Sequence, residues 1–308
     1  MDDVEIERLL GGRPRIAPAD IVGHPHLPEA RKLYCDRFLD VYSGDPFLVR
    51  LLIEAGRFMV YFWVAALDAA HDPANRETWP TVGLLKEKMA RLGLASGRQI
   101  DDIIARMCAV GFMELQPSEQ DRRVRLLKPT EKLHAHDRDW LVAHYSPHTV
   151  LFPQYDYGLV MHRNRQFQAV HRRTCVAFAS LGQKMMFSAP DMLLFFNRAG
   201  GFMVIAALLQ AAMAKGDGDP HATVPYADIG DRFGVSRTHV RKLLKSAEEI
   251  GLVKLHARGG HRVEILPRLW TSHDAGLAGG MYFHDVVHVA AEKAFRSADN
   301  RRGQAMSA

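Results

Sequence analysis

The stretch TVPYADIGDRFGVSRTHVRKLLKSAEEIGLVKLHARGGHRVEILPR, residues Thr223–Arg268, carries the most informative pattern in the chain. A glycine separates a short apolar-polar helical pattern from a second, longer one. Ser236 is placed to cap that second helix, and its apolar positions recur at helical spacing until Gly251. Two short apolar runs follow, Leu252–Leu255 and Val263–Leu266, with a basic, glycine-containing turn between them. The stretch therefore predicts a helix, a tight turn, a capped helix and a β-hairpin.

This order of elements resembles a winged helix-turn-helix, which implies binding to double-stranded DNA. The outer face of the second helix is cationic, and insertion into a major groove requires such a face, because Lys and Arg neutralise phosphates while Arg and Thr read base edges. An ordinary solvated helix face is the alternative interpretation. In this unit the residues expected to contact DNA are Ser236, Arg237, Thr238, His239, Arg241, Lys242, Lys245, Arg258, His261 and Arg262.

The chain also repeats itself. Ala55–Val60 and Ala199–Val204 are identical at five of six positions, at an offset of 199 − 55 = 144. The cap and terminal glycine of the basic helix have counterparts 140 residues earlier, at Ser96 and Gly111. A repeat of this length indicates an internal duplication, with one winged unit in each copy.

The first copy resembles a particular family. Its hairpin reads QDRRVRLLKPTEK (Gln120–Lys132) and is similar to the wing of MarR-type regulators, in which an acidic-Arg-Arg tip leads into a Leu-x-x-Thr-Glu-Lys helix entry. Leu133 departs from the glycine usual in that family. MarR-type proteins are homodimers with one winged helix per subunit, so the resemblance implies a fused, monomeric pseudo-dimer, open to further dimerisation.

We therefore expect a mainly α fold with small β-hairpin wings, in which two tandem winged helix-turn-helix units are joined by a helical core. The expected divisions are an extended N-terminal arm (1–28), a first MarR-like copy (29–150), a second copy (151–296) and a disordered tail (297–308). The expected function is that of a bacterial-type transcriptional regulator that binds a specific DNA sequence. Two alternatives remain open: a tandem winged-helix replication initiator that binds direct repeats, and a winged-helix protein-interaction module.

The two copies differ on the helix face expected to meet DNA. Asp101 and Asp102 stand where the second copy has Arg241 and Lys242. Carboxylates oppose phosphate, although they can accept a hydrogen bond from cytosine N4. The difference predicts an asymmetric, quasi-palindromic site with half-sites about one helical turn, ~34 Å, apart. In the first copy, the residues expected to contact DNA are Ser96, Arg98, Gln99, Arg122, Arg123 and Arg125.

Aromatic residues gather in the helices that precede each winged unit. MarR-type proteins often hold a small aromatic effector beside these helices, so the resemblance implies a pocket, which the run Met185–Phe187 could also line. We favour the simpler interpretation, in which these residues form the core that joins the copies. The pocket candidates are Tyr61, Trp63, Phe195 and Phe196.

Composition excludes several classes of protein. The 308 residues carry a formal net charge of +5, and the three cysteines are too widely spaced for a disulfide framework or a zinc ribbon. His284 and His288 have the i, i+4 spacing of metal ligands but lack a third ligand, so no metal or cofactor is expected. No catalytic motif is present, and we expect no enzyme activity. Without a signal peptide or a membrane-spanning apolar run, we expect a cytoplasmic protein that binds no membrane.

Overall fold

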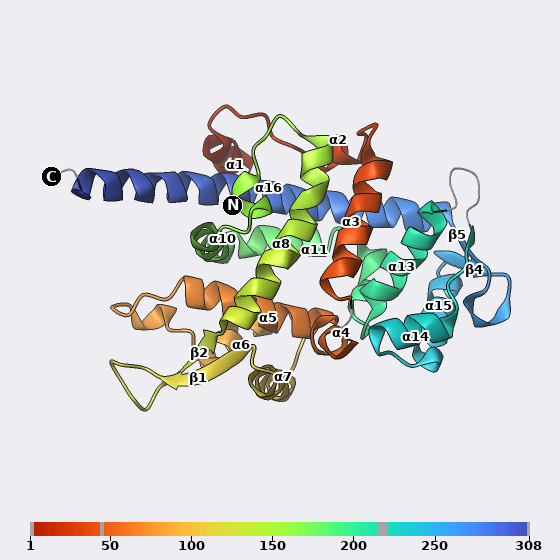
Figure 1. Cartoon of the computed structure of the whole chain (residues 1–308), viewed down its shortest axis with the longest axis horizontal. Coiled ribbons are helices and arrows are strands. Elements are labelled where there is room, and N and C mark those ends of the chain that lie inside the picture. The colour runs from red at the N-terminus through yellow and green to blue at the C-terminus, as the bar shows by residue number, and fades with distance from the viewer. Residues whose placement is uncertain (1–2, 44–45, 215–220, 307–308) are drawn as a thin grey trace.

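The computed structural model describes residues 3–43, 46–214 and 221–306. The protein is mainly helical and has two small antiparallel sheets, as expected from the sequence. In Figure 1 one sheet lies at the lower left and the other at the right, while the long C-terminal helix runs along the length of the molecule.

The first half of the chain contains eight α-helices, one 3-10 helix and one hairpin within the described residues. They are α1 (Asp3–Leu10), α2 (Pro18–Val22), α3 (Leu27–Val41), α4 (Pro46–Leu52), α5 (Ala55–Ala69), η1 (Arg76–Thr78), α6 (Val82–Ala90), α7 (Gly97–Ala109), β1 (Met113–Pro117), β2 (Arg125–Pro129) and α8 (Glu131–Leu151).

The second half follows with a similar order of elements. They are α9 (Gly158–Met161), α10 (Arg165–Ala177), α11 (Ala179–Met186), η2 (Pro190–Met192), α12 (Leu193–Phe196), α13 (Gly201–Met213), β3 (His221–Ala222), α14 (Tyr226–Phe233), α15 (Arg237–Glu249), β4 (Val253–Leu255), η3 (Arg258–Gly260), β5 (Val263–Ile265) and α16 (Pro267–Met306).

Helices α7 and α15 have the same kinds of residue at their two ends, a serine N-cap and a C-terminal glycine. The hydroxyl oxygen of Ser96 accepts a hydrogen bond from the backbone N–H three residues on, at 3.3 Å, and Ser236 does the same for α15 at 3.1 Å. Each helix is followed by a glycine in the left-handed region, Gly111 with φ +72° and Gly251 with φ +73°. Since a side chain is strained in that region, glycine ends the helix and turns the chain into the hairpin.

In each sheet, a hairpin pairs with a segment that precedes the two helices next to it in the chain. These helices are α6 and α7 in the first half, and α14 and α15 in the second. Strands β1 and β2 pair from Met113↔Pro129 to Pro117↔Arg125, and Thr81 adds an isolated bridge to Leu126. In the second sheet the order is β3-β5-β4. We call α6, α7, β1 and β2 the first helix–hairpin unit, and β3, α14, α15, β4 and β5 the second.

A central layer of helices joins the two halves. Helix α3 packs against α8 of its own half and against α13 of the second half. Helix α10 packs in the corresponding way, against α16 of its own half and α5 of the first. One large apolar core therefore runs through both halves, and a smaller cluster forms where α1, α10 and α11 meet α16.

Two expectations about the ends of the chain are wrong. The predicted extended arm (1–28) contains the helices α1 and α2, because Ile6, Leu10 and Ile21 bury their side chains against the helical core. The predicted disordered tail (297–308) is helical as far as Met306, since α16 continues without a break, and residues 307–308 lie outside the described residues.

Helix α13 is almost wholly apolar and is buried between the halves. The preceding segment Pro190–Phe196 and this helix, bent by 111° relative to each other, together meet the length and composition of a membrane span. Within the described ranges, no single helix is both long enough and apolar enough to cross a bilayer.

Candidate nucleic-acid interface and apolar cavity

Helix α15 has one apolar and one cationic face. Its buried side chains are Val240, Leu243, Leu244 and Ala247, which pack into the core. The predicted contact residues on the opposite side are all exposed: Ser236, Arg237, Thr238, Arg241, Lys242 and Lys245. The structure therefore presents four cations from one helix to solvent.

His239 does not belong to this exposed face. Its Nε2 lies 2.8 Å from the carbonyl oxygen of Ala199, and the side chain is partly buried. The sequence grouped it with its exposed neighbours, but the imidazole is turned toward the α12–α13 connection. His239 is therefore less accessible than its exposed neighbours on α15.

The hairpin of the second unit ends in a basic tip. Arg258, His261 and Arg262 are all exposed, as predicted. The tip contains a short 3-10 turn in which Gly259 has φ +73°. One guanidinium nitrogen of Arg262, Nη2, lies 3.4 Å from Nε2 of His221 on β3.

The equivalent face of α7 is mixed in charge. Asp101 is exposed but forms an ion pair with Lys86 of α6 at 2.7 Å, which partly neutralises it. Arg98 and Asp102 are also exposed. The amide oxygen of Gln99 accepts a hydrogen bond from the backbone N–H of Ser96 at 2.8 Å, so it completes the helix cap. This face offers less positive charge than α15.

The tip of the first hairpin holds three exposed arginines: Arg122, Arg123 and Arg125. Asp121 shapes the turn, because its Oδ1 accepts the backbone N–H of Arg123 at 3.1 Å. Its Oδ2 lies 3.4 Å from the guanidinium of Arg76. The carboxylate of Asp121 thus makes its contacts within the protein, and the three exposed arginines remain available to bind an anion.

A surface hollow that the sequence did not predict lies between the two units. It is lined by Arg50 at the end of α4, Arg57 of α5 and Arg106 of α7, together with Ser236 at the start of α15. Arg57 is paired with Glu54 at 3.3 Å, whereas Arg50 and Arg106 are exposed. No local pattern could reveal this group, because its members converge only when α4 and α7 meet the second unit.

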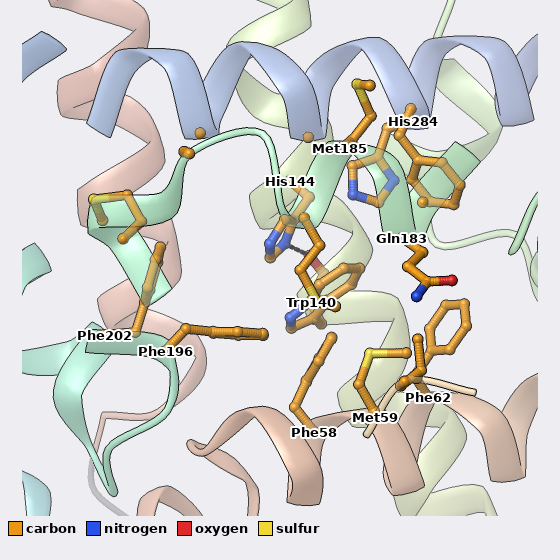
Figure 2. Close-up of a pocket in the computed structure, with 18 of the residues that line it drawn as sticks. Phe58, Met59, Phe62, Trp140, His144, Gln183, Met185, Phe196, Phe202 and His284 are labelled. Carbon is orange, nitrogen blue, oxygen red and sulfur yellow. Dashed lines mark hydrogen bonds between the residues drawn. The ribbon is translucent and has the colours of Figure 1, made fainter. Parts of the chain in front are cut away.

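A second cavity, of about 420 Å³, lies between the two halves of the chain. Figure 2 shows Phe58 and Phe62 of α5, Trp140 of α8, and Phe196 and Phe202 of the second half turned toward a common space. Met59 and Met185 add flexible side chains to the wall. This volume falls in the usual range for small-molecule sites, and the lining is mostly apolar.

Two of the four predicted pocket residues line this cavity, namely Trp63 and Phe196. Tyr61 is buried beside it and directs its hydroxyl to Nδ1 of His136, at 2.9 Å. Phe195 is completely buried in the core. Met185 and Met186 of the predicted methionine run also line the cavity, so the sequence located the region but not the orientation of each ring.

Two buried histidines of the cavity wall, His144 and His284, favour the neutral form. The ring of His144 stacks on Trp140 with centroids 3.5 Å apart, and its Nε2 lies 3.3 Å from the hydroxyl of Tyr34. Burial lowers the pKa of His144 to about 3. The pKa of His284 also lies well below its usual value because of burial. The cavity therefore favours an uncharged, aromatic or aliphatic guest.

The charged lining residues mark the side of the cavity nearest solvent. The side chains of Glu54, Lys88 and Arg91 are 32%, 24% and 71% exposed, respectively. Lys88 lies on α6, and Arg91 is the first residue after this helix. A guest in the cavity would consequently touch both the helical core and the first helix–hairpin unit.

Histidines gather in two different environments. His288 directs Nε2 to the carbonyl oxygen of Asp156 at 3.1 Å, and both His284 and His288 are buried. Among the described residues, the group with metal-ligand geometry lies instead on the second sheet, where His221, His256 and Glu264 place their ligand atoms within 4.8 Å of one another.

Comparison with known proteins identifies no relative. No protein-family model, curated protein or solved structure matches the chain. Any function must therefore be argued from the residues and their geometry.

Proposed function

We propose that the chain is a MarR-like internal duplication, with two tandem winged helices on one polypeptide, that binds double-stranded DNA sequence-specifically and regulates transcription. The observation that carries this proposal is α15, which buries an apolar stripe and exposes Arg237, Arg241, Lys242 and Lys245 beside a basic hairpin tip. A helix of this kind supports insertion into a major groove, with the hairpin on the adjacent backbone.

The two units contribute unequally to binding. In the second unit, Arg241 and Lys242 provide affinity through phosphates and specificity through base edges. In the first unit, Asp101 and Asp102 weaken the helix contact, so the hairpin arginines supply most of the attraction. The arginines of the intervening hollow, Arg50 and Arg106, would meet the backbone between the two contacts. The expected DNA site is quasi-palindromic, with one half-site better defined.

An uncharged apolar effector would bind in the cavity and alter DNA affinity. The cavity walls come from α5 and α8 of the first half and from α11, α13 and α16 of the second. A guest that fits one arrangement of the halves better than another shifts the population of that arrangement. Because Lys88 of α6 also faces the cavity, the first helix–hairpin unit would respond.

The experiment is selection of bound duplexes from random DNA, followed by fluorescence anisotropy on the selected site. The variant Arg241→Ala with Lys242→Ala should weaken binding by more than about tenfold and lower the slope of log affinity against log salt by about 2. The matched control, Lys32→Ala with Arg296→Ala, removes the same charge from α3 and α16 and should bind as the parent does.

Other outcomes would favour other functions. Selection of clustered direct repeats would support a replication initiator. Failure to enrich any sequence, with affinity that is equally low for all duplexes, would contradict DNA recognition and support a protein-interaction module.

A further inference from the structure

We propose that the second sheet holds a divalent transition metal, with Zn²⁺ as the preferred ion, through His221, His256 and Glu264. The site lies on the sheet β3-β5-β4, none of whose residues lines the apolar cavity. Its existence does not depend on the proposed binding to DNA, because it rests on the ligand geometry alone.

The register of the sheet brings the three side chains to one face. His221 on β3 stands directly opposite Glu264 on β5. Lys254 on β4 is the partner of Glu264 on the other side, and His256 lies two residues beyond Lys254. Directly opposed and diagonal residues of antiparallel strands point to the same face of a sheet. Three segments therefore each contribute one ligand to a single point.

The distances suit a metal after small side-chain rotations. Nε2 of His256 lies 2.6 Å from Oε2 of Glu264, and all three ligand atoms lie within 4.8 Å of one another. A tetrahedral zinc ion with bonds of about 2.0–2.2 Å needs its ligands roughly 3.3–3.6 Å apart. The His256–Glu264 pair must open slightly to admit the ion, His221 supplies the third ligand, and water takes the fourth position.

The donor set narrows the choice of metal. Two imidazoles and one carboxylate suit Zn²⁺ and its neighbours Co²⁺, Ni²⁺ and Cu²⁺, whereas Mg²⁺ and Ca²⁺ require mostly oxygen ligands. His221 and Glu264 are partly buried and His256 is exposed, so an ion can reach the site without any opening of the core.

Two cations beside the site oppose the ion. Nη2 of Arg262 lies 3.4 Å from Nε2 of His221, and Lys254 is the direct strand partner of Glu264. A metal that takes the His221 nitrogen must displace Arg262 from it. If the proposed function is correct, this displacement places a positive charge and an arginine at the DNA backbone, so the metal should strengthen DNA binding.

The test is calorimetric titration of chelator-treated full-length protein with ZnCl₂ at neutral pH. The parent should bind one ion per chain at the hairpin, and His256→Ala and Glu264→Gln should each weaken that binding more than about tenfold. His261→Ala, which removes an exposed imidazole of the same hairpin outside the group, should bind as the parent does. Equal zinc affinity in the parent and in His256→Ala would overturn the proposal.

Lys254→Met separates loss of the site from loss of folding. Removal of the opposing ammonium should tighten zinc binding, and a misfolded hairpin could not produce that gain. Unchanged or weaker zinc binding in Lys254→Met would contradict the geometry proposed here. The zinc titrations contain no DNA. They therefore test the metal site even if the protein does not bind DNA.

Discussion

Arg31 of α3 and Asp274 of α16 form a bidentate ion pair between the two halves of the chain, with both N···O distances 2.6 Å. Arg172 of α10 and Asp137 of α8 form the same kind of pair in the opposite sense. Each pair thus joins an early helix of one half to a late helix of the other. Reciprocal contacts of this kind are typical of two-fold homodimers, and they support the duplication proposed above.

The inner pair should matter more for stability than the outer one. Asp137→Ala leaves the fully buried Arg172 guanidinium without a partner, which should lower the free energy of unfolding by about 3–5 kcal/mol. Asp274→Ala should have a smaller effect, because both members of its pair keep more than a tenth of their side-chain surface exposed. Urea denaturation measures both changes.

Asp139→Ala on the same helix is the control. Its carboxylate pairs with Arg163 at 2.6 Å, but both side chains are about half exposed, so the change should be at most about 1 kcal/mol. An Asp137→Ala effect no larger than that of Asp139→Ala would contradict the structural importance of the inner pair.

Because of its buried histidines, the protein should lose stability at mildly acidic pH. Burial lowers the pKa of His144 to about 3 and of His148 to about 4. In the unfolded chain these groups titrate near 6.5, so the unfolded state binds protons that the folded state does not. Their contribution is fully present above pH 6.5 and is lost as the pH falls toward 4. At pH 5.5 each histidine should reduce stability by about 1.4 kcal/mol.

Urea denaturation between pH 7.5 and 5.5 checks this dependence. His148→Gln should reduce the slope of the unfolding free energy against pH by the equivalent of nearly one proton. His26→Gln, which changes an exposed histidine, should leave that slope unchanged. A stability that does not change over this range would show that the buried imidazoles take up protons at the same pH in the folded protein as in the unfolded chain.

The carboxylates on α7 provide a test of whether the two helix–hairpin units contact DNA unequally. Asp101→Asn with Asp102→Asn should strengthen binding to all duplexes, because it removes two negative charges from the face proposed to meet phosphate. Anisotropy titrations on selected and random duplexes, at several salt concentrations, measure the change. Weaker binding confined to the selected site would instead indicate that a carboxylate accepts a hydrogen bond from cytosine N4.

The cavity can be filled without a clash at one position. A Cβ added at Gly280 on α16 would meet no heavy atom within 4 Å, and this glycine lines the cavity. Gly280→Leu should therefore occupy the space and abolish binding of the neutral fluorescent probe N-phenyl-1-naphthylamine. Gly280→Ala, which adds one methyl group, should retain most of it. Equal probe binding by the leucine variant and the parent would place the probe elsewhere.

Local signals in the sequence predicted the local structure well. Ser96, Ser236, Gly111 and Gly251 lie at the helix boundaries expected of them, since capping and left-handed turns depend on a few adjacent residues. The exposed face of α15 followed from helical spacing for the same reason. The contact of His239 could not be predicted, because its partner, the Ala199 carbonyl, lies 40 residues away in the sequence.

Features that depend on tertiary contacts could not be predicted. The residues of the arm form helices because they pack against a core formed by distant parts of the chain, and the sequence of the arm alone does not show which surface it meets. Of the pocket candidates, Trp63 reaches the cavity while the neighbouring Tyr61 faces His136, a difference that depends on where α8 lies. The proposed metal ligands on the second sheet depend on β3, whose two residues give almost no strand signal.

The reciprocal ion pairs have a consequence for how this protein can change. In a homodimer one codon specifies both copies of a residue, so every substitution at the interface occurs twice. Here Arg31 and Arg172 are encoded separately, as are Asp137 and Asp274. A single mutation therefore alters one side of the molecule and leaves the other intact, and the two halves can accumulate different substitutions while one ion pair continues to join them.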